Sequence, residues 1–297
     1  MKIWFMKFEG PTFALAAVIY GCWLALVWFH EAIPWWLLWP AAAYVTAWHF
    51  NFQHEIVHGW RSIPSWLRFA IAYPPLSLWF PLDIYVRNHS IHHRNQRLTY
   101  PGQDTETFYH KGEDWAGYSR AWRWIYMANQ TLVGRLLLGP WLRWRKLVMI
   151  DIGKMFRGDL SDLGIWIRHS IAVAVLLWFV LNVAGMPFWQ FFLFFTLSGM
   201  MLGMVRPFLE HRWGEKPFER VAVIESNWVF GLLFLWNNIH IVHHLHPTMP
   251  WYEIPGFYKR NRTRMLELNG NFVYRGYYEL ARNYLLTPTF RPIHPDA

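Results

Sequence analysis

The sequence has a single cysteine, Cys22, among its 297 residues. One thiol cannot form a disulfide within the chain, and it cannot build a thiolate metal site. Any metal that the chain binds must therefore use histidine and oxygen ligands. The sequence also contains no His-Pro-Gly-Gly haem motif, no cysteine cluster and no glycine-rich loop of the flavin-binding type. We therefore expect no fused electron-transfer domain.

Charged residues are also few, at 16%, whereas 54% of the residues are hydrophobic and 20% are aromatic. This balance is far from that of soluble globular proteins. Four windows are nearly free of charge, with Arg168 as the exception, and each is close to the length of about 20 residues that a bilayer-spanning helix needs. They are residues 11–29, 34–52, 165–184 and 187–205. The sequence therefore predicts an all-α integral membrane protein with about four transmembrane helices in two hairpins.

The basic residues predict how these helices are oriented. The two short turns between paired windows, residues 30–33 and 185–186, contain no Lys or Arg. Basic residues favour the cytoplasmic side of short loops, so we expect nearly the whole net charge of +9 and both termini there. The first window lacks a small-residue cleavage site and should remain as the first helix. We interpret the basic and aromatic residues 1–10 as an anchor at the membrane surface.

The more polar residues, 54–164 and 206–297, should form interfacial helices and a cytoplasmic helical cap, and residues 1–297 are expected to form one domain. Residues 61–83 are apolar but contain Pro64, Pro74, Pro75 and Pro81, so we expect a broken segment that returns to the same membrane face. Residues 115–164 mix Trp, Leu and Arg, which is typical of amphipathic helices along a membrane surface. A chain held in this way is not expected to bind nucleic acid.

Histidine is the residue type whose distribution stands out. His240, His243 and His244 form an H-x-x-H-H cluster, and His89, His92 and His93 repeat its spacing. Residues three and four positions apart on a helix share one face, so each cluster can present several imidazoles to one metal. With 15 histidines in the chain, chance would give about 0.04 copies of this pattern. Two copies therefore indicate a metal site.

Two further groups extend this set. HEIVH places His54 and His58 four residues apart, and His211 follows the last apolar window in RPFLEHRWG. Nine histidines exceed the six positions of one octahedral metal, whereas two five- or six-coordinate metals would accommodate them, a count that suits iron better than tetrahedral zinc. The candidate ligands are His54, His58, His89, His92, His93, His211, His240, His243 and His244.

Carboxylates are expected to hydrogen-bond the distal ring nitrogens of such ligands and to orient them. The candidates from sequence position are Glu55, Glu210, Asp83 and Glu225. We interpret Asp104 and Glu106, in PGQDTETFY, as part of a solvated turn, with support of the second cluster as the alternative. His246 is expected to lie beside the ligands or in a substrate channel rather than on the metal.

Two other functions fit parts of the same sequence. HEIVH also matches the H-E-x-x-H pattern of zinc hydrolases, in which the glutamate is the general base. An intramembrane zinc metallohydrolase would use His54, Glu55 and His58 with Asp83 as its third ligand, but both H-x-x-H-H clusters would then have no purpose. The second alternative is a non-catalytic, metal-binding membrane protein.

The three histidine boxes resemble those of the membrane-bound fatty acid desaturase and hydroxylase superfamily. The resemblance runs from the first hairpin to the third box. His54 and His58 match the first box, the cluster from His89 to His93 the second, and the cluster from His240 to His244 the third, with His211 where the family often supplies a further ligand. The stretch HHLHPTMPWYEIP is also similar to bacterial carotenoid ketolases, whereas the second box continues differently, into RNQRLTYPGQDTETFY.

This resemblance implies that the boxes hold two iron ions at the cytoplasmic membrane surface. In the family, molecular oxygen and two electrons attack an unactivated C–H bond, which yields either an alkene or an alcohol. It also implies an acyl-lipid or other largely apolar substrate, and a separate electron donor such as ferredoxin with its reductase. The compact loops favour the cytoplasmic (inner) membrane of a bacterium, with the metal site on the cytoplasmic side.

Overall fold

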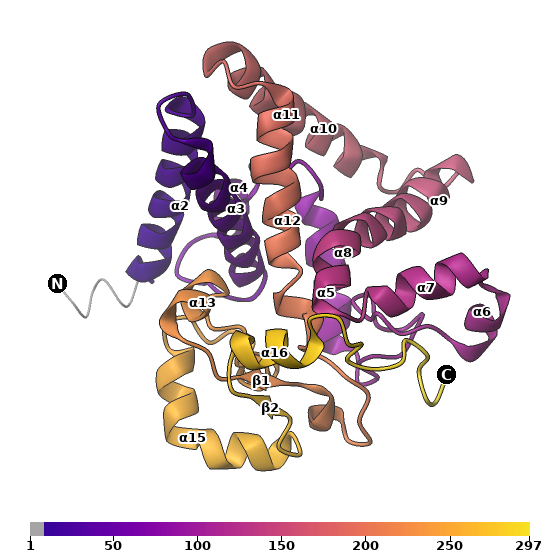
Figure 1. The fold of residues 1–297 in the computed structure, drawn as a ribbon. Coiled ribbons are helices and arrows are strands. Elements are labelled where there is room, and N and C mark those ends of the chain that lie inside the picture. The colour runs from indigo at the N-terminus through magenta and orange to yellow at the C-terminus, as the bar shows by residue number, and fades with distance from the viewer. Residues whose placement is uncertain (1–8) are drawn as a thin grey trace. The chain divides into compact units, whose positions relative to one another are not determined.

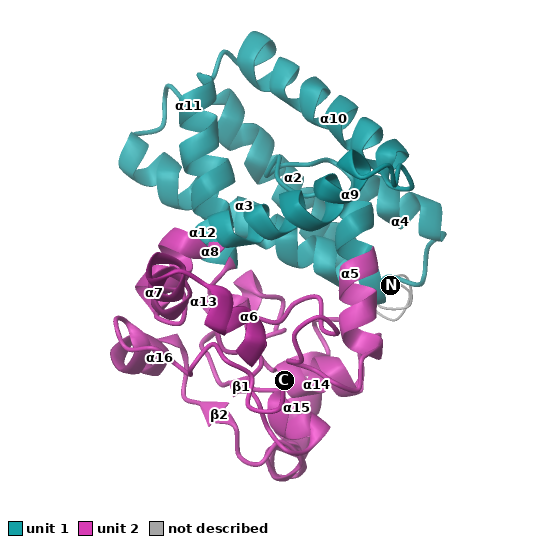
Figure 2. Cartoon of the chain, turned by 90° about the vertical axis from the view of Figure 1, so that its right-hand side faces the viewer, with its two compact units in different colours: residues 1–86, 140–203 teal, residues 87–139, 204–297 magenta. Residues whose placement is uncertain are grey.

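The computed structural model describes residues 9–297, so nearly all of the surface anchor expected at residues 1–10 lies outside the described part. The described chain is mostly helical, as predicted, and its only paired strands are β1 (Val223–Ile224) and β2 (Val273–Tyr274), which run parallel. It divides into two compact units, each built from two stretches of chain (Figure 2). Unit 1 comprises residues 1–86 and 140–203, and unit 2 comprises residues 87–139 and 204–297.

Unit 1 contains the apolar helices. Its first stretch forms α2 (Gly10–Trp28), α3 (Trp35–His58) and α4 (Ser65–Ala72). Its second stretch contains the end of α8 (Leu132–Leu147), the π-helical turn η1 (Val148–Ile152), α9 (Gly153–Phe156), α10 (Leu163–Trp178) with its continuation η2 (Phe179–Val183), α11 (Phe188–Phe191), η3 (Phe192–Leu197) and α12 (Ser198–Gly203). Helix α3 packs against both α2 and α12 (Figure 1). A Cβ on Gly199 of α12 would lie 2.5 Å from Thr46 Cβ, so only glycine permits this approach.

In the described residues, three helical stretches are long and apolar enough to cross a membrane: Gly10–Trp28, Leu163–Val183 and Phe188–Phe208. The chain is therefore a membrane protein, but the predicted arrangement of four spans in two hairpins is not confirmed. The helix expected at residues 34–52 does form, as α3, and it continues to His58. Its second half contains Asn51, Gln53 and Glu55, which lower its hydropathy.

The segment after α3 is broken, as its prolines predict. Helix α4 begins after Pro64 and has only eight residues. The chain between α4 and α5 (Leu82–Arg94) contains Pro74, Pro75 and Pro81, and Leu78 has a left-handed backbone at φ 65°. Proline lacks the N–H that a helix interior requires, so this stretch cannot continue α4.

Unit 2 contains short helices around a small core. Besides most of α5 and the first half of α8, they are α6 (Gly112–Gly117), α7 (Arg120–Ala128), the 3₁₀ turns η4 (Arg206–Phe208) and η5 (Pro217–Arg220), α13 (Trp228–Leu233), α14 (His240–Leu245), α15 (Ile254–Leu268) and α16 (Tyr277–Tyr284). Val223 of β1, Ile241 and Val242 of α14 and Met265 of α15 are buried in the same hydrophobic core. This core fixes α14 against the strands.

A strained turn leads into α14. Leu235 and Trp236 both have left-handed backbones, at φ 48° and 58°, a conformation that residues other than glycine rarely adopt. The turn brings the Trp236 ring onto Gly231, where an added Cβ would lie 2.5 Å from the ring. Backbone strain of about 1–3 kcal/mol per residue is typical of positions that the surrounding structure holds for function. Here the strained residues immediately precede the third histidine box.

Candidate metal centre

Two helices of unit 2 carry the two H-x-x-H-H clusters. Helix α14 buries Ile241 and Val242 in the core, and its 3.6-residue period places His240, His243 and His244 on the remaining faces. Helix α5 has Asp83 in its first turn and Arg94 in its last turn, a charge distribution that the helix dipole favours, and it carries the second cluster toward its end. The structure divides each cluster between two groups of ligand atoms: His240 and His244, four residues apart, share one group with His92, whereas His89, His93 and His243 belong to the other.

Four histidines of unit 2 bring one ligand atom each to a common point. His92 comes from α5, His240 and His244 from α14, and His211 from the segment after η4; all four ligand atoms lie within 4.8 Å of one another. The His211 Nε2 atom is 3.1 Å from His92 Nε2 and 3.0 Å from His240 Nε2. The His240 and His244 Nε2 atoms are 3.1 Å apart.

Hydrogen bonds at the opposite ring nitrogens assign the proton position in three neutral rings of this group. His92 Nδ1 lies 2.7 Å from Asp104 Oδ1, His211 Nδ1 lies 3.1 Å from the Arg220 carbonyl oxygen, and His240 Nδ1 lies 3.2 Å from the Asn237 carbonyl oxygen. Because these oxygens only accept, each neutral ring must keep its proton on Nδ1. Three Nε2 lone pairs then face one another, an arrangement that a metal cation between them would stabilise.

The spacing of the four nitrogens also fits a metal. Ligands about 2.1 Å from an octahedral ion lie about 3.0 Å apart when they are adjacent, against about 3.4 Å around a tetrahedral ion. Three pairs of these nitrogens are 3.0–3.1 Å apart, and all four ligand atoms lie within 4.8 Å of one another. These separations are compatible with ligands around one metal ion.

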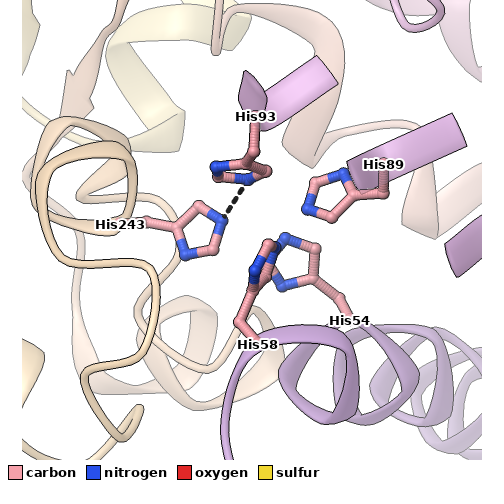
Figure 3. Close-up of side chains that lie close together, drawn as sticks. All are labelled: His54, His58, His89, His93 and His243. Atoms are coloured by element: carbon pink, nitrogen blue, oxygen red, sulfur yellow. Dashed lines mark hydrogen bonds between the residues drawn. The ribbon is translucent and has the colours of Figure 1, made fainter. Parts of the chain in front are cut away.

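A second group of histidines in unit 2 consists of His89, His93 and His243. The Nε2 atoms of His93 and His243 are 2.9 Å apart, and Figure 3 shows these two rings pointing toward each other. The ring centroids of His89 and His93 are 4.5 Å apart. In unit 1, His54 and His58 lie one turn apart at the end of α3, with ring centroids 5.6 Å apart.

Asp104 and Glu106 orient the second box, so their interpretation as a solvated turn is wrong. The Asp104 side chain is 1% exposed, and its carboxylate accepts hydrogen bonds from His92 Nδ1 and from the backbone N–H groups of Thr99 and Glu106. The Glu106 carboxylate lies 3.0 Å from His89 Nδ1. The backbone is left-handed at Thr99 and Gly102, where the chain reverses direction. This reversal brings the carboxylates of Asp104 and Glu106 to the histidines of α5.

We expect Asp104→Asn to weaken metal binding by about 10- to 100-fold, the usual cost of losing a carboxylate behind a ligating histidine. The amide can still accept a hydrogen bond from His92 Nδ1, but it no longer carries the negative charge that makes the imidazole a better donor. Metal affinity measured by competition with a chelator checks this. Asp114→Asn, at an exposed position on α6, is the matched control. Equal affinities in the two variants would contradict the orienting role.

Of the other carboxylates considered, Glu210 lies beside a ligand. Its Oε1 atom is 3.4 Å from His240 Nδ1 and 3.0 Å from Arg206 Nε, and burial raises the pKa of Glu210 to about 7. Glu225 instead accepts hydrogen bonds from Tyr258 and Arg262. Asp83 forms an ion pair with Arg168 at 3.4 Å, and it belongs to no group of ligand atoms within residues 9–297. Glu55 is buried near the end of α3.

His246, in contrast, is exposed and packs its ring against Phe257, with centroids 4.9 Å apart. It lies outside both groups of ligand atoms. The expectation that His246 is not a metal ligand therefore agrees with its position. It also offers a natural control for substitutions in the third box.

Burial favours the neutral form of several of these imidazoles. It lowers the pKa of His211 to about 3 and holds the pKa values of His240 and His244 well below 6.5. Burial also disfavours the charged form of His92, but the carboxylates of Asp104, Glu106 and Glu210 outweigh this and raise its pKa. Neutral imidazole is the form that binds a metal.

These shifts predict how the metal-free protein responds to acid. His211, His240 and His244 bind protons in the unfolded chain near pH 6.5 but not in the folded one, so the unfolded state takes up more protons as pH falls below that value. Their stabilisation is complete above about pH 6.5 and is lost progressively toward pH 3, while His92 and Glu210, whose pKa values are raised in the folded chain, oppose this loss in part. We expect the melting temperature of chelator-treated protein in detergent to fall between pH 7 and pH 5. A constant or rising melting temperature would contradict the burial of these neutral rings.

Comparison with protein families gives a match over most of the chain. The family model described as "Fatty acid desaturase" matches residues 33–276, which include all nine candidate ligands. No curated protein matches the chain. The matched range begins just before α3 and ends just before α16.

Proposed function

The chain belongs to the fatty acid desaturase family, and from this membership we propose that it is an oxygen-dependent diiron oxidoreductase of the membrane. Membership in the family implies an oxidoreductase. We propose that it desaturates or hydroxylates an unactivated C–H position of an acyl lipid or another largely apolar substrate. The observation that carries the proposal is the convergence of four histidine Nε2 atoms. In three of these rings, those of His92, His211 and His240, an oxygen acceptor holds the Nδ1 atom on the opposite side.

We propose two sets of metal ligands. The first is the four-histidine group formed by His92, His211, His240 and His244. The second comprises His89, His93 and His243, completed by the first box, His54 and His58. Three imidazoles leave the second metal short of ligands, and the first box offers two more on one face of α3, at i and i+4. Imidazole-rich sets with five or six positions favour iron over tetrahedral zinc.

Two bound irons would supply the redox chemistry, using molecular oxygen and two electrons to remove hydrogen from substrate. The residues of the chain have two tasks in this scheme. The carboxylates of Asp104 and Glu106 hold the Nδ1 side of His92 and His89, and the Asn237 carbonyl oxygen accepts from His240 Nδ1, so these contacts fix the direction of each Nε2 atom. The dense packing around His240 and His243, which are 1% and 4% exposed, limits the access of water.

We propose that α3 is the second of four membrane crossings, with α2 as its hairpin partner. Its packing between α2 and α12, two apolar helices, supports this. The absence of Lys and Arg from residues 30–33 and 185–186 supports a cytoplasmic location for the termini and the metal centre. We further propose a bacterial inner membrane and a separate electron donor such as ferredoxin with its reductase.

The test is the metal content and the oxygen-dependent activity of the same preparation. Protein expressed in iron-replete medium and purified in mild detergent should contain about two irons per chain. With reduced ferredoxin, its reductase and oxygen, it should convert fatty acyl substrates in membrane vesicles to unsaturated or hydroxylated products, as detected by mass spectrometry. One zinc per chain without oxygen-dependent products would overturn the proposal.

A further inference from the structure

Residues 290–297 run beside residues 109–112, and both stretches belong to unit 2. The His110 N–H donates to the Pro292 carbonyl oxygen at 2.7 Å, and the His294 N–H donates to the His110 carbonyl oxygen at 3.0 Å. The Gly112 N–H donates to the Ala297 carbonyl oxygen at 3.0 Å, which places residue 297 beside α6 (Figure 1). These backbone bonds hold the segment next to the chain that follows Glu106.

His294 connects this segment to the loop before Asp104. His294 is 1% exposed, its Nε2 atom lies 3.2 Å from the Thr99 hydroxyl oxygen, and its Nδ1 atom lies 3.1 Å from the Asp296 backbone nitrogen. Burial lowers the pKa of His294, which favours the neutral ring. Because a backbone N–H only donates, Nδ1 must accept, and the ring proton lies on Nε2. The His294 Nε2–H group therefore donates to the Thr99 hydroxyl.

Thr99 links this bond to the metal-binding group. Its backbone is left-handed at φ 75°, a conformation that a β-branched residue adopts only when its surroundings hold it. Two side chains hold it here, because the Thr107 hydroxyl donates to the Thr99 carbonyl oxygen and His294 donates to the Thr99 side chain. The Thr99 N–H in turn donates to Asp104 Oδ2 at 2.8 Å, while Asp104 Oδ1 lies 2.7 Å from His92 Nδ1. His294 thus lies two bonded contacts away from the carboxylate that orients His92.

Asp296 makes a second connection, at the surface. Its Oδ2 atom accepts hydrogen bonds from the Tyr100 hydroxyl at 3.0 Å and from the Trp213 indole N–H at 2.8 Å. Tyr100 belongs to the loop before Asp104, and Trp213 lies two residues after His211. One carboxylate of the segment therefore joins the loop that orients one ligand to the chain that carries another.

We propose that residues 290–297 form a clasp that sets the metal affinity of the four-histidine group. Within the clasp, His294 is a positioning residue that acts through Thr99 and Asp104. The inference rests on the proposed function, because it requires the four-histidine group to bind a metal. The bond from His294 keeps Thr99 in the conformation whose N–H holds one Asp104 oxygen, and the other oxygen is then fixed on His92 Nδ1. Without that bond the carboxylate rotates more freely and orients His92 less well.

Hydrogen–deuterium exchange of the metal-free, full-length protein in detergent tests the clasp in the absence of metal. His294→Leu keeps a side chain of similar size but removes the donor, so peptides covering residues 97–107 should exchange several-fold faster than in the wild type. His294→Gln, which can place an amide N–H near the Nε2 position, should restore part of the protection. Arg291→Ala, at an exposed position of the same segment, is the matched control and should change nothing. Unchanged exchange in His294→Leu would overturn the clasp.

Metal affinity tests whether the clasp acts on the ligands. Cobalt(II), whose absorption reports its coordination, is titrated into the same proteins in competition with a chelator. His294→Leu should weaken one bound equivalent by about tenfold, the lower end of the effect of groups behind a ligating histidine, and His294→Gln should recover part of it. Arg291→Ala should bind cobalt as the wild type does.

Thr99→Val tests the other end of the bond, because it removes the hydroxyl but keeps the β-branched shape. It should weaken the same cobalt equivalent, and adding it to His294→Leu should weaken binding no further, since both changes delete one bond. Thr99→Val also provides the test if His294→Leu does not fold. Independent, multiplying effects of the two substitutions would overturn the path through Thr99.

The remaining outcomes separate this inference from the proposed function. Faster exchange in His294→Leu with unchanged cobalt affinity would overturn the effect of the clasp on metal binding, while the wild-type metal centre would stand. A wild-type protein that binds no cobalt would overturn the proposed metal centre and the clasp together.

Discussion

His240→Ala should remove the metal of the four-histidine group and reduce turnover by more than about 100-fold, because it deletes a ligand rather than a residue behind one. The His240 Nε2 atom lies 3.0 Å from that of His211 and 3.1 Å from that of His244, so its loss opens the middle of the donor set. It also leaves Glu210 without the ring beside it. Metal per chain and product formation, measured on one preparation, check the prediction.

His246→Ala is the matched control, since His246 lies in the same segment but is exposed and packs against Phe257. That variant should retain both metals and its activity. His240→Gln keeps a polar side chain in the buried site, and it should lose the metal while the protein retains its helical content by circular dichroism. Full metal content in a folded His240→Gln protein would mean that this group does not bind the metal.

The sequence allowed the histidine clusters to be placed because their spacing is local. His240, His243 and His244 lie on one short helix, and α5 carries the second cluster in the same way, so the rings of each cluster lie close together. The division of each cluster between two groups of ligand atoms depends on how the two helices pack, which the spacing does not predict. His211 was identified by a different signal, its position after an apolar window. All four members of the four-histidine group were therefore candidates before the fold was known.

The orienting carboxylates could not be predicted in the same way. Asp104 reaches His92 across 12 residues and Glu106 reaches His89 across 17, through a turn with left-handed Thr99 and Gly102. That geometry depends on loop conformation rather than on a repeating pattern. The available signal was the pair of acids in PGQDTETFY directly after the second box, in a turn that its Pro-Gly dipeptide already predicted.

Hydropathy does not identify α3 as a membrane span, because its apolar residues are interspersed with polar ones and it ends in the first histidine box. Helix α3 begins with Trp35 and continues through apolar residues, but it ends with the polar first box. Within residues 35–52 the helix already contains Pro40, His49 and Asn51, which lower its mean hydropathy before the first histidine box is reached.

His243→Ala and Asp83→Asn separate the proposed enzyme from the zinc hydrolase that HEIVH also suggests. In the diiron scheme His243 is a ligand, and its Nε2 atom lies 2.9 Å from that of His93, so His243→Ala should abolish activity and lose metal. Asp83 has no place in that scheme. Its partner is Arg168, in an ion pair whose side chains are 38% and 57% exposed, and such pairs contribute about 0–1 kcal/mol.

Asp83→Asn should therefore keep its metals and most of its activity, with a melting temperature within a few degrees of the wild type. A hydrolase built on His54, Glu55 and His58 requires the reverse, because Asp83 would be its third ligand and His243 would be dispensable. Metal content and activity of the two variants, purified side by side, decide between these schemes. His243 is 4% exposed, whereas Asp83 lies in a surface ion pair. In the diiron scheme, Asp83→Asn should therefore change metal content and activity much less than His243→Ala does. An inactive, metal-free Asp83→Asn beside an active His243→Ala would favour the hydrolase.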